Sequence, residues 1–123
     1  MPDLKILIAD NSPTMRRILI NTVVKAGYPN CKEAEDGKDA LAKLMAGDFD
    51  FLITDWNMPN MNGIELVEAV RADKKLNSIP ILMITTRNMK DDIVNAIKQG
   101  VNGYIIKPFD AKTLNAKISE IMG

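Results

Sequence analysis

Short apolar runs alternate with amphipathic helical patterns along this chain of 123 residues, and the alternation narrows the fold more than any other feature. Strands that alternate with helices favour a parallel sheet, because each crossover between parallel strands needs a helix-sized connection. No linker is long enough to divide the chain, so we expect one domain over residues 1–123. The expected strands are residues 5–9, 31–34, 51–54, 81–84 and 104–106.

Capping residues and glycines mark the expected helix boundaries. The first helix should begin after the N-cap residue Ser12, with Pro13 at its first position, and end at Gly27. The others are expected to span about 37–46, to follow the turn at 59–63, to end at Gly100 and to begin near Asp110. The side chains expected to face the core are Met15, Ile18, Leu19, Thr22, Val23, Ala26, Ala40, Leu41, Leu44, Met45, Ile64, Val67, Val70, Ile93, Ala96, Ile97, Leu114, Ile118 and Ile121.

Polar residues stand where the expected strands end. Right-handed crossovers place helices on both faces of the sheet, which is the doubly wound α/β class. For five such strands the usual order is 2-1-3-4-5, with the first and third strands adjacent. Ligands of open α/β sheets bind at the carboxyl ends of the strands, near the point where strand order reverses. The residues at those ends are Asp10-Asn11, Asp55-Trp56-Asn57, Thr85 and Lys107-Pro108.

These residue types fit a site for a phosphate and a metal ion. Two carboxylates at neighbouring strand ends repel each other, so Asp10 and Asp55 need a cation between them. Mg²⁺ takes oxygen ligands, keeps several waters and often adds a phosphate oxygen. Lys107 can pair with a carboxylate or a phosphoryl oxygen, and the Thr85 hydroxyl can donate to the same group. Each residue also has an ordinary structural interpretation, as a turn aspartate, a solvated lysine or a strand threonine.

The composition excludes several classes of function. Sixteen basic and sixteen acidic residues leave no net charge, which argues against a general nucleic-acid binder. The apolar runs are far shorter than the ~20 residues of a membrane span. The chain has no histidine, which excludes histidine-based nucleophilic catalysis, and its single cysteine, Cys31, cannot build a disulfide framework. A cytoplasmic setting is therefore expected. No P-loop motif occurs in the sequence.

Four segments in order resemble the response-regulator receiver domains, and among them the members that act in chemotaxis. The segments are residues 10–17, 54–63, 83–85 and 103–109, and the resemblance covers almost the whole chain. It implies a flavodoxin-like fold with the strand order 2-1-3-4-5. It also implies a single-domain response regulator that accepts a phosphoryl group and is not a turnover enzyme acting on a separate substrate.

The resemblance implies a role for each residue at the expected site. Asp55 would accept the phosphoryl group from a phosphohistidine kinase, and Thr85 and Lys107 would contact that group. Mg²⁺ would be the cofactor, held by the side chains of Asp10 and Asp55 and by the backbone carbonyl of Asn57.

Further positions are implied to control the response. Thr85 and Tyr104 would form the conformational switch, while strand propensity alone would make Tyr104 an ordinary half-exposed aromatic residue. Asn57 and Arg87 would tune the access of the water that removes the phosphoryl group, although Arg87 fits an ordinary solvated charge equally well. The Lys107–Pro108 peptide bond is expected in the cis form.

One position departs from the family pattern. Receivers usually have two acids after the first strand, and the second binds the metal directly; this chain has Asn11 there. The amide oxygen of Asn11 can still bind Mg²⁺, but one negative charge is missing. We therefore expect weaker Mg²⁺ binding than in a receiver with two acids.

The resemblance also implies partners: a sensor histidine kinase of the chemotaxis type, a flagellar motor switch protein as target, and a phosphatase. We expect a monomer that binds no nucleic acid and enters no membrane. The surface that binds the target would include, or lie near, Met89, Lys90, Lys112 and Lys117. Such residues more commonly form an ordinary solvated helix surface.

Two other functions remain open at this stage. One is a phosphorelay intermediate that passes its phosphoryl group to a histidine phosphotransfer protein. The other is a Mg²⁺-dependent phosphatase of the haloacid dehalogenase type with Asp55 as nucleophile. The second is disfavoured because Asn57 stands where such enzymes have a catalytic Asp, and because the chain has no cap region.

Overall fold

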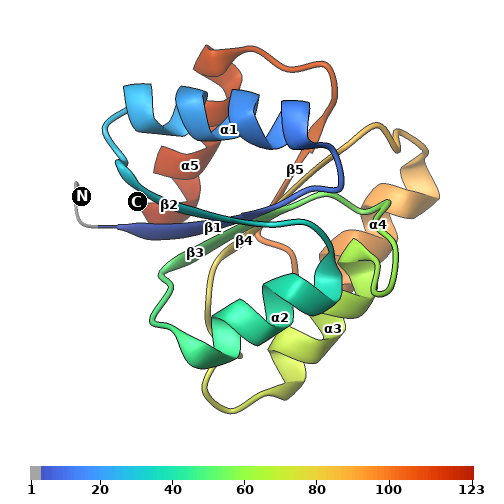
Figure 1. The fold of residues 1–123 in the computed structure, drawn as a ribbon. Coiled ribbons are helices and arrows are strands. Elements are labelled where there is room, and N and C mark those ends of the chain that lie inside the picture. The colour runs from blue at the N-terminus through green and yellow to red at the C-terminus, as the bar shows by residue number, and fades with distance from the viewer. Residues whose placement is uncertain (1–3) are drawn as a thin grey trace.

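A five-stranded parallel sheet forms the centre of the molecule (Figure 1), as seen in a computed structural model that describes residues 4–123. The strands are β1 (Lys5–Ala9), β2 (Asn30–Ala34), β3 (Phe51–Thr54), β4 (Ile81–Thr85) and β5 (Gly103–Ile106). Their order is β2-β1-β3-β4-β5 and every neighbouring pair is parallel. The predicted flavodoxin-like fold class is therefore confirmed.

Five helices cover the two faces of this sheet. They are α1 (Pro13–Lys25), α2 (Gly37–Ala46), α3 (Gly63–Ala72), α4 (Lys90–Gln99) and α5 (Ala111–Met122). Helices α1 and α5 lie on one face, and α2, α3 and α4 lie on the other (Figure 1). No helix in the described part of the chain is long and apolar enough to cross a membrane.

The core consists of two apolar layers, one on each side of the sheet. Successive side chains of a strand point to opposite faces. In β1, Leu7 therefore packs under α2 and α3, whereas Ile6 and Ile8 pack under α1 and α5. β3 and β4 are buried along their whole length. Burial on both faces explains why these strands are continuous apolar runs rather than alternating ones.

The helix N-termini lie at the carboxyl edge of the sheet, because each helix follows a strand. Side-chain oxygens cap four of them by accepting a hydrogen bond from a backbone N–H group. Ser12 caps α1 and Asp110 caps α5, as predicted, while Asp36 caps α2 and Asn62 caps α3. The N-cap residue of helix α4 is Met89, which provides no side-chain cap.

Three residues predicted to face the core are exposed instead. The exposed fractions are 46% for Ile18, 48% for Met45 and 57% for Ile97. A helix lying flat on a sheet buries a narrow stripe of its surface, and the apolar pattern of these helices is wider than that stripe. Helix α4 is the extreme case, since Ala96 is the residue it buries fully.

Candidate functional site

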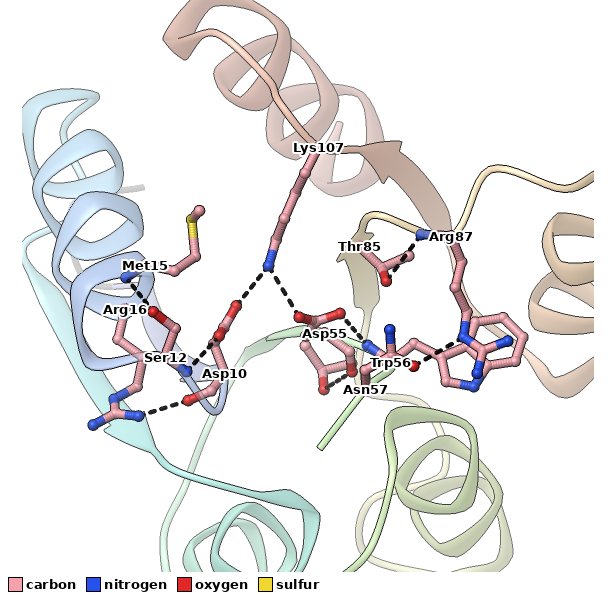
Figure 2. A network of polar contacts seen from close by, with 11 residues as sticks. Asp10, Ser12, Met15, Arg16, Asp55, Trp56, Asn57, Thr85, Arg87 and Lys107 are labelled. Carbon is pink, nitrogen blue, oxygen red and sulfur yellow. Dashed lines mark hydrogen bonds and ion pairs between the residues drawn. The ribbon is translucent and has the colours of Figure 1, made fainter. Parts of the chain in front are cut away.

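The ends of β1, β3 and β5 bring together the two carboxylates and the lysine that the sequence singled out. Lys107 Nζ lies 2.9 Å from Asp10 Oδ2 and 3.0 Å from Asp55 Oδ2, so one ammonium group bridges both acids (Figure 2). Asp10 and Asp55 are neighbours because β1 pairs with β3, with Ala9 opposite Thr54. Lys107 lies farther along the same edge, and its long side chain crosses that distance.

The second oxygen of each carboxylate is held by a backbone N–H group. Ser12 N donates to Asp10 Oδ1 at 2.8 Å, and Trp56 N donates to Asp55 Oδ1 at 2.6 Å. Each carboxylate is thus fixed from two sides, by the ammonium group of Lys107 and by the chain that follows it.

Lys107 is held in its charged state by this arrangement. Its side chain is 11% exposed, and burial alone would lower its pKa. The hydrogen bonds and negative charges of Asp10 and Asp55 outweigh burial, so the pKa of Lys107 is raised above its ordinary value. One ammonium and two carboxylates leave the centre of the site with a net negative charge.

Thr85 is fully buried at the end of β4, the strand between β3 and β5. Its hydroxyl accepts a long hydrogen bond of 3.4 Å from Arg87 N, and its backbone carbonyl accepts one from Lys107 N at 2.8 Å. Thr85 therefore joins the site through the backbone of Lys107. The Lys107–Pro108 peptide bond is cis, as expected.

Arg87 is not a free solvated charge. Its guanidinium lies 4.5 Å from the centre of the Trp56 ring, and its Nε donates to Asn57 Oδ1 at 3.0 Å (Figure 2). Its Nη1 also lies 3.5 Å from Asp92 Oδ1 in the first turn of α4. Arg87 therefore links the two residues that follow Asp55 to helix α4. Stacking of a guanidinium on an indole ring is favourable.

Tyr104 is connected to the same group of residues. Its hydroxyl donates to the backbone carbonyl of Arg87 at 2.8 Å. Burial raises the pKa of Tyr104 to about 12, with a further contribution from the negative charge of Asp92. Tyr104 thus remains a neutral hydrogen-bond donor across the physiological pH range.

The oxygen atoms near the bridge fit a hard cation. In the described residues no group of three or more His, Cys, Asp or Glu side chains is placed to hold a metal ion. A cation at this position would be held by two carboxylates, with neutral oxygens and water completing its coordination, and such a set of donors suits Mg²⁺. Asn11 is exposed beside Asp10, while the amide oxygen of Asn57 already accepts from Arg87. The backbone carbonyl of Asn57 is thus the oxygen of this residue that could bind a cation.

Two residues of this network were given no role on the basis of the sequence. Trp56 provides the surface on which Arg87 stacks. Arg16 Nη1 donates to the backbone carbonyl of Asp10 at 2.6 Å, and its Nε pairs with Glu33 at the same distance, so it fixes the end of β1. The contacts of Arg87 with Trp56 and of Arg16 with Glu33 join residues distant in sequence, and a single sequence gives no signal for them.

Comparison with known proteins supports the family that the sequence segments 10–17, 54–63, 83–85 and 103–109 resemble. The sequence profile of the response regulator receiver domain matches residues 6–119. The chain belongs to the response regulator receiver family. The chemotaxis protein CheY of Pseudomonas aeruginosa is 52% identical over 118 residues, which cover 96% of this chain and 95% of that protein. CheY-3 of Vibrio cholerae is 50% identical, with 97% of this chain and 92% of that protein covered.

Solved structures agree with these relatives. The structure of CheY4 from Vibrio cholerae superimposes on this receiver domain with a TM-score of 0.90 at 36% sequence identity, covering 97% of this chain and 98% of that one. Receiver domains act as response regulators rather than as turnover enzymes. This chain is therefore a receiver domain of the chemotaxis type.

Lys107→Met should lower the free energy of unfolding at neutral pH by about 1–3 kcal/mol, because two largely buried carboxylates lose their shared counter-ion. The raised pKa of Lys107 gives this difference a pH dependence. A group whose pKa is higher in the folded protein than in the unfolded chain stabilises the folded state. This stabilisation is complete below the pKa of the unfolded chain, which for lysine is near 10.5, and it is lost as the pH rises through the pKa of the folded protein. The difference should therefore be constant around neutral pH and shrink in strongly alkaline solution.

Urea unfolding in the presence of EDTA measures this difference. Lys112→Met removes an exposed lysine at the start of α5 and is the matched control. A difference that persists unchanged well above the pKa of Lys107 would show that lost packing, not the lost charge, explains the effect.

Proposed function

We propose that Asp55 accepts a phosphoryl group from the phosphohistidine of a chemotaxis-type sensor kinase. The observation that supports this most directly is the ammonium of Lys107, held 2.9 and 3.0 Å from the two carboxylates. A carboxylate oxygen of Asp55 attacks phosphorus as the P–N bond breaks, and the electron pair of that bond goes to the imidazole nitrogen. The product is an acyl phosphate on Asp55.

The residues around Asp55 suit this transfer. Phosphoryl transfer spreads charge over the three equatorial oxygens of phosphorus, so catalysis consists mainly of positioning and of neutralising that charge. Trp56 N holds one oxygen of Asp55 and thereby fixes the orientation of the carboxylate. Lys107 supplies a fixed positive charge, and the Thr85 hydroxyl, whose present hydrogen bond is long, is a ready donor to a phosphoryl oxygen.

Mg²⁺ is the proposed cofactor, and the receiver domain of a sensor histidine kinase from Pseudomonas aeruginosa has been solved with a magnesium ion coordinated in its active site cleft. When bound, it would neutralise negative charge on the carboxylates and on the phosphoryl oxygens. Asp10 and Asp55 would hold it with their side chains, Asn57 with its backbone carbonyl and Asn11 with its amide oxygen. Asn57 and Arg87 would in addition regulate the water that hydrolyses the acyl phosphate, since a hydrogen bond joins their side chains two residues beyond Asp55 and Thr85.

Thr85 and Tyr104 are the proposed switch. Movement of Thr85 toward a phosphoryl group would change its contact with Arg87, whose carbonyl accepts the hydrogen bond from Tyr104. The output surface proposed for this switch is formed by α4, β5 and α5. On it the exposed fractions are 67% for Met89, 57% for Ile97 and 40% for Ile106. Such an apolar surface favours a protein target, which we propose is the flagellar motor switch.

Asp55→Asn should abolish the uptake of label from radioactive acetyl phosphate in the presence of Mg²⁺. Wild-type protein should take up about one phosphoryl group per chain, and hydroxylamine should release it as expected for an acyl phosphate. Asp50→Asn is the control, because Asp50 lies at the opposite edge of the sheet, where it accepts a hydrogen bond from Lys5 N. Many turnovers of small phosphoesters by the wild type would instead favour the phosphatase.

Asn11→Asp should strengthen Mg²⁺ binding roughly tenfold, because one more carboxylate charge near the ion is worth more than ~1 kcal/mol at the effective dielectric constant of a protein surface. Quenching of Trp56 fluorescence by Mg²⁺ gives the dissociation constant. Asn21→Asp adds the same charge to the exposed surface of α1 and should change little. Equal or weaker binding by Asn11→Asp would refute the proposed role of Asn11.

Beryllofluoride, a mimic of the phosphoryl group, should raise the affinity of this protein for the motor switch protein of the same organism about tenfold, a typical allosteric coupling. Ile97→Asp should remove most of that binding, whereas Met45→Asp, a comparably exposed position on α2, should leave it intact. Pull-down and calorimetry measure both effects. Binding to a histidine phosphotransfer protein with no affinity for the motor switch would identify a phosphorelay intermediate.

A further inference from the structure

The loop between β3 and α3 holds three groups of the proposed site at one end and is attached to helix α2 at the other. Asp55, Trp56 and Asn57 occupy its first three positions. Beyond them, Asn60 Nδ2 donates to Asp36 Oδ2 at 2.7 Å, and Gly37 N donates to the backbone carbonyl of Met61 at 3.0 Å. Neither contact is needed to complete the sheet.

Asp36 does more than cap α2. An N-cap needs one acceptor oxygen, and Asp36 Oδ1 fills that role by accepting from Asp39 N at 2.8 Å. Its second oxygen is used for Asn60, and the residue is only 7% exposed although it carries a charge. Hydrogen bonds from Asp39 N and from the Asn60 side chain lower the pKa of Asp36, so the carboxylate stays charged. A serine would cap the helix equally well but could not reach both partners.

The loop packs closely against two glycines near these contacts. A Cβ atom on Gly37 would overlap the backbone carbonyl of Met61, and a Cβ atom on Gly63 would overlap the backbone carbonyl of Asp55. Gly63 N also donates to the carbonyl of Trp56 at 2.8 Å. The loop is therefore held closely between the start of α2 and the start of α3.

Asn60 has a backbone conformation that suits this attachment. Its φ of 68° lies in the left-handed region, which asparagine and aspartate tolerate better than most residues. This conformation turns the chain so that the amide side chain meets Asp36 while the next carbonyl meets Gly37. Two adjacent residues of the loop thus bind two adjacent residues of the helix start.

These contacts close a ring around the site. Asp10 N donates to the carbonyl of Ala34 at 3.1 Å, which joins the strand of one carboxylate to the segment that leads into Asp36. Asp36 and Asn60 then join that segment to the loop of Asp55, and Lys107 joins Asp55 to Asp10. The separation of the two carboxylates is consequently fixed on the outer side as well as by the ammonium group.

We propose that Asp36, Gly37 and Asn60 form a loop clamp that sets the Mg²⁺ affinity and the phosphoryl acceptance of the site. The clamp touches neither the ion nor the phosphoryl group, so its members are positioning residues that act through the loop of residues 55–62. The inference rests on the proposed function, because it assigns the clamp an effect on that same site. Partners beyond the direct ligands commonly change metal affinity by about 10–100-fold.

Exchanging the two side chains of the clamp tests this role. Asp36→Ser keeps an oxygen for the cap but is too short to reach Asn60 as well, and Asn60→Asp places two carboxylates together. Each single substitution should weaken Mg²⁺ binding at least about tenfold, read from Trp56 fluorescence. The combination of Asp36→Asn with Asn60→Asp restores a donor facing an acceptor, keeps the net charge, and should return the affinity to within about threefold of wild type.

Two further measurements separate positioning from general stability. Hydrogen exchange at the Gly63 amide, without metal, should be faster in each single variant and normal in the exchanged pair. Asp73→Ser serves as the stability control, because Asp73 accepts from Lys75 N and Leu76 N at the opposite edge of the sheet. That variant should lose stability without losing Mg²⁺ affinity.

The outcomes separate the clamp from the function on which it rests. Single variants with wild-type Mg²⁺ affinity and wild-type Gly63 exchange would overturn the clamp, and so would an exchanged pair no better than either single variant. If the wild type neither bound Mg²⁺ nor took up a phosphoryl group, the proposed function would fall, while Gly63 exchange would still decide whether the clamp holds the loop.

Discussion

The rest of this structure depends on the double ion pair of Lys107 with Asp10 and Asp55. The parallel sheet places the ends of β1 and β3 side by side, so two carboxylates must lie close together at low exposure. Such a pair is unfavourable unless a cation offsets the repulsion. Lys107 offsets it incompletely, since one positive charge faces two negative ones. The fold therefore builds a site with a remaining demand for positive charge, and that demand favours a divalent metal ion.

Rigidity around the site makes this demand useful for chemistry. Backbone N–H groups of Ser12 and Trp56 hold the carboxylates, and these groups belong to the segments that lead away from the strands. Preorganised charges and donors stabilise a developing charge without rearrangement, which is the main source of catalysis in phosphoryl transfer. Helix starts collect at the same edge because every strand leads into a helix there. Architecture and chemistry thus follow from one feature, the parallel direction of the strands.

The sequence was sufficient for what depends on local pattern. Apolar runs and capping residues predicted the strands and most helix boundaries, and the strand order is the known order of the family. The meeting of Asp10, Asp55 and Lys107 followed from that order. The exposure of Ile97 could not be predicted in this way, because it depends on the angle at which α4 lies on the sheet. The stacking of Arg87 on Trp56 and the bond from Asn60 to Asp36 also join distant segments through side-chain rotamers, which no periodicity records.

The two ends of α4 are held very differently. At the C-terminal end, Arg71 donates to the carbonyl of Gly100 from Nε at 3.1 Å and from Nη2 at 2.7 Å. At the other end Met89 provides no cap, and the 3.5 Å ion pair of Arg87 with Asp92 is partly exposed and worth less than about 1 kcal/mol. Arg87 also contacts Asn57 and Trp56, so a change at Asp55 that drew Arg87 away would release the weaker end of α4 first. The exposed apolar residues of α4 would then move with that end while Gly100 stays in place.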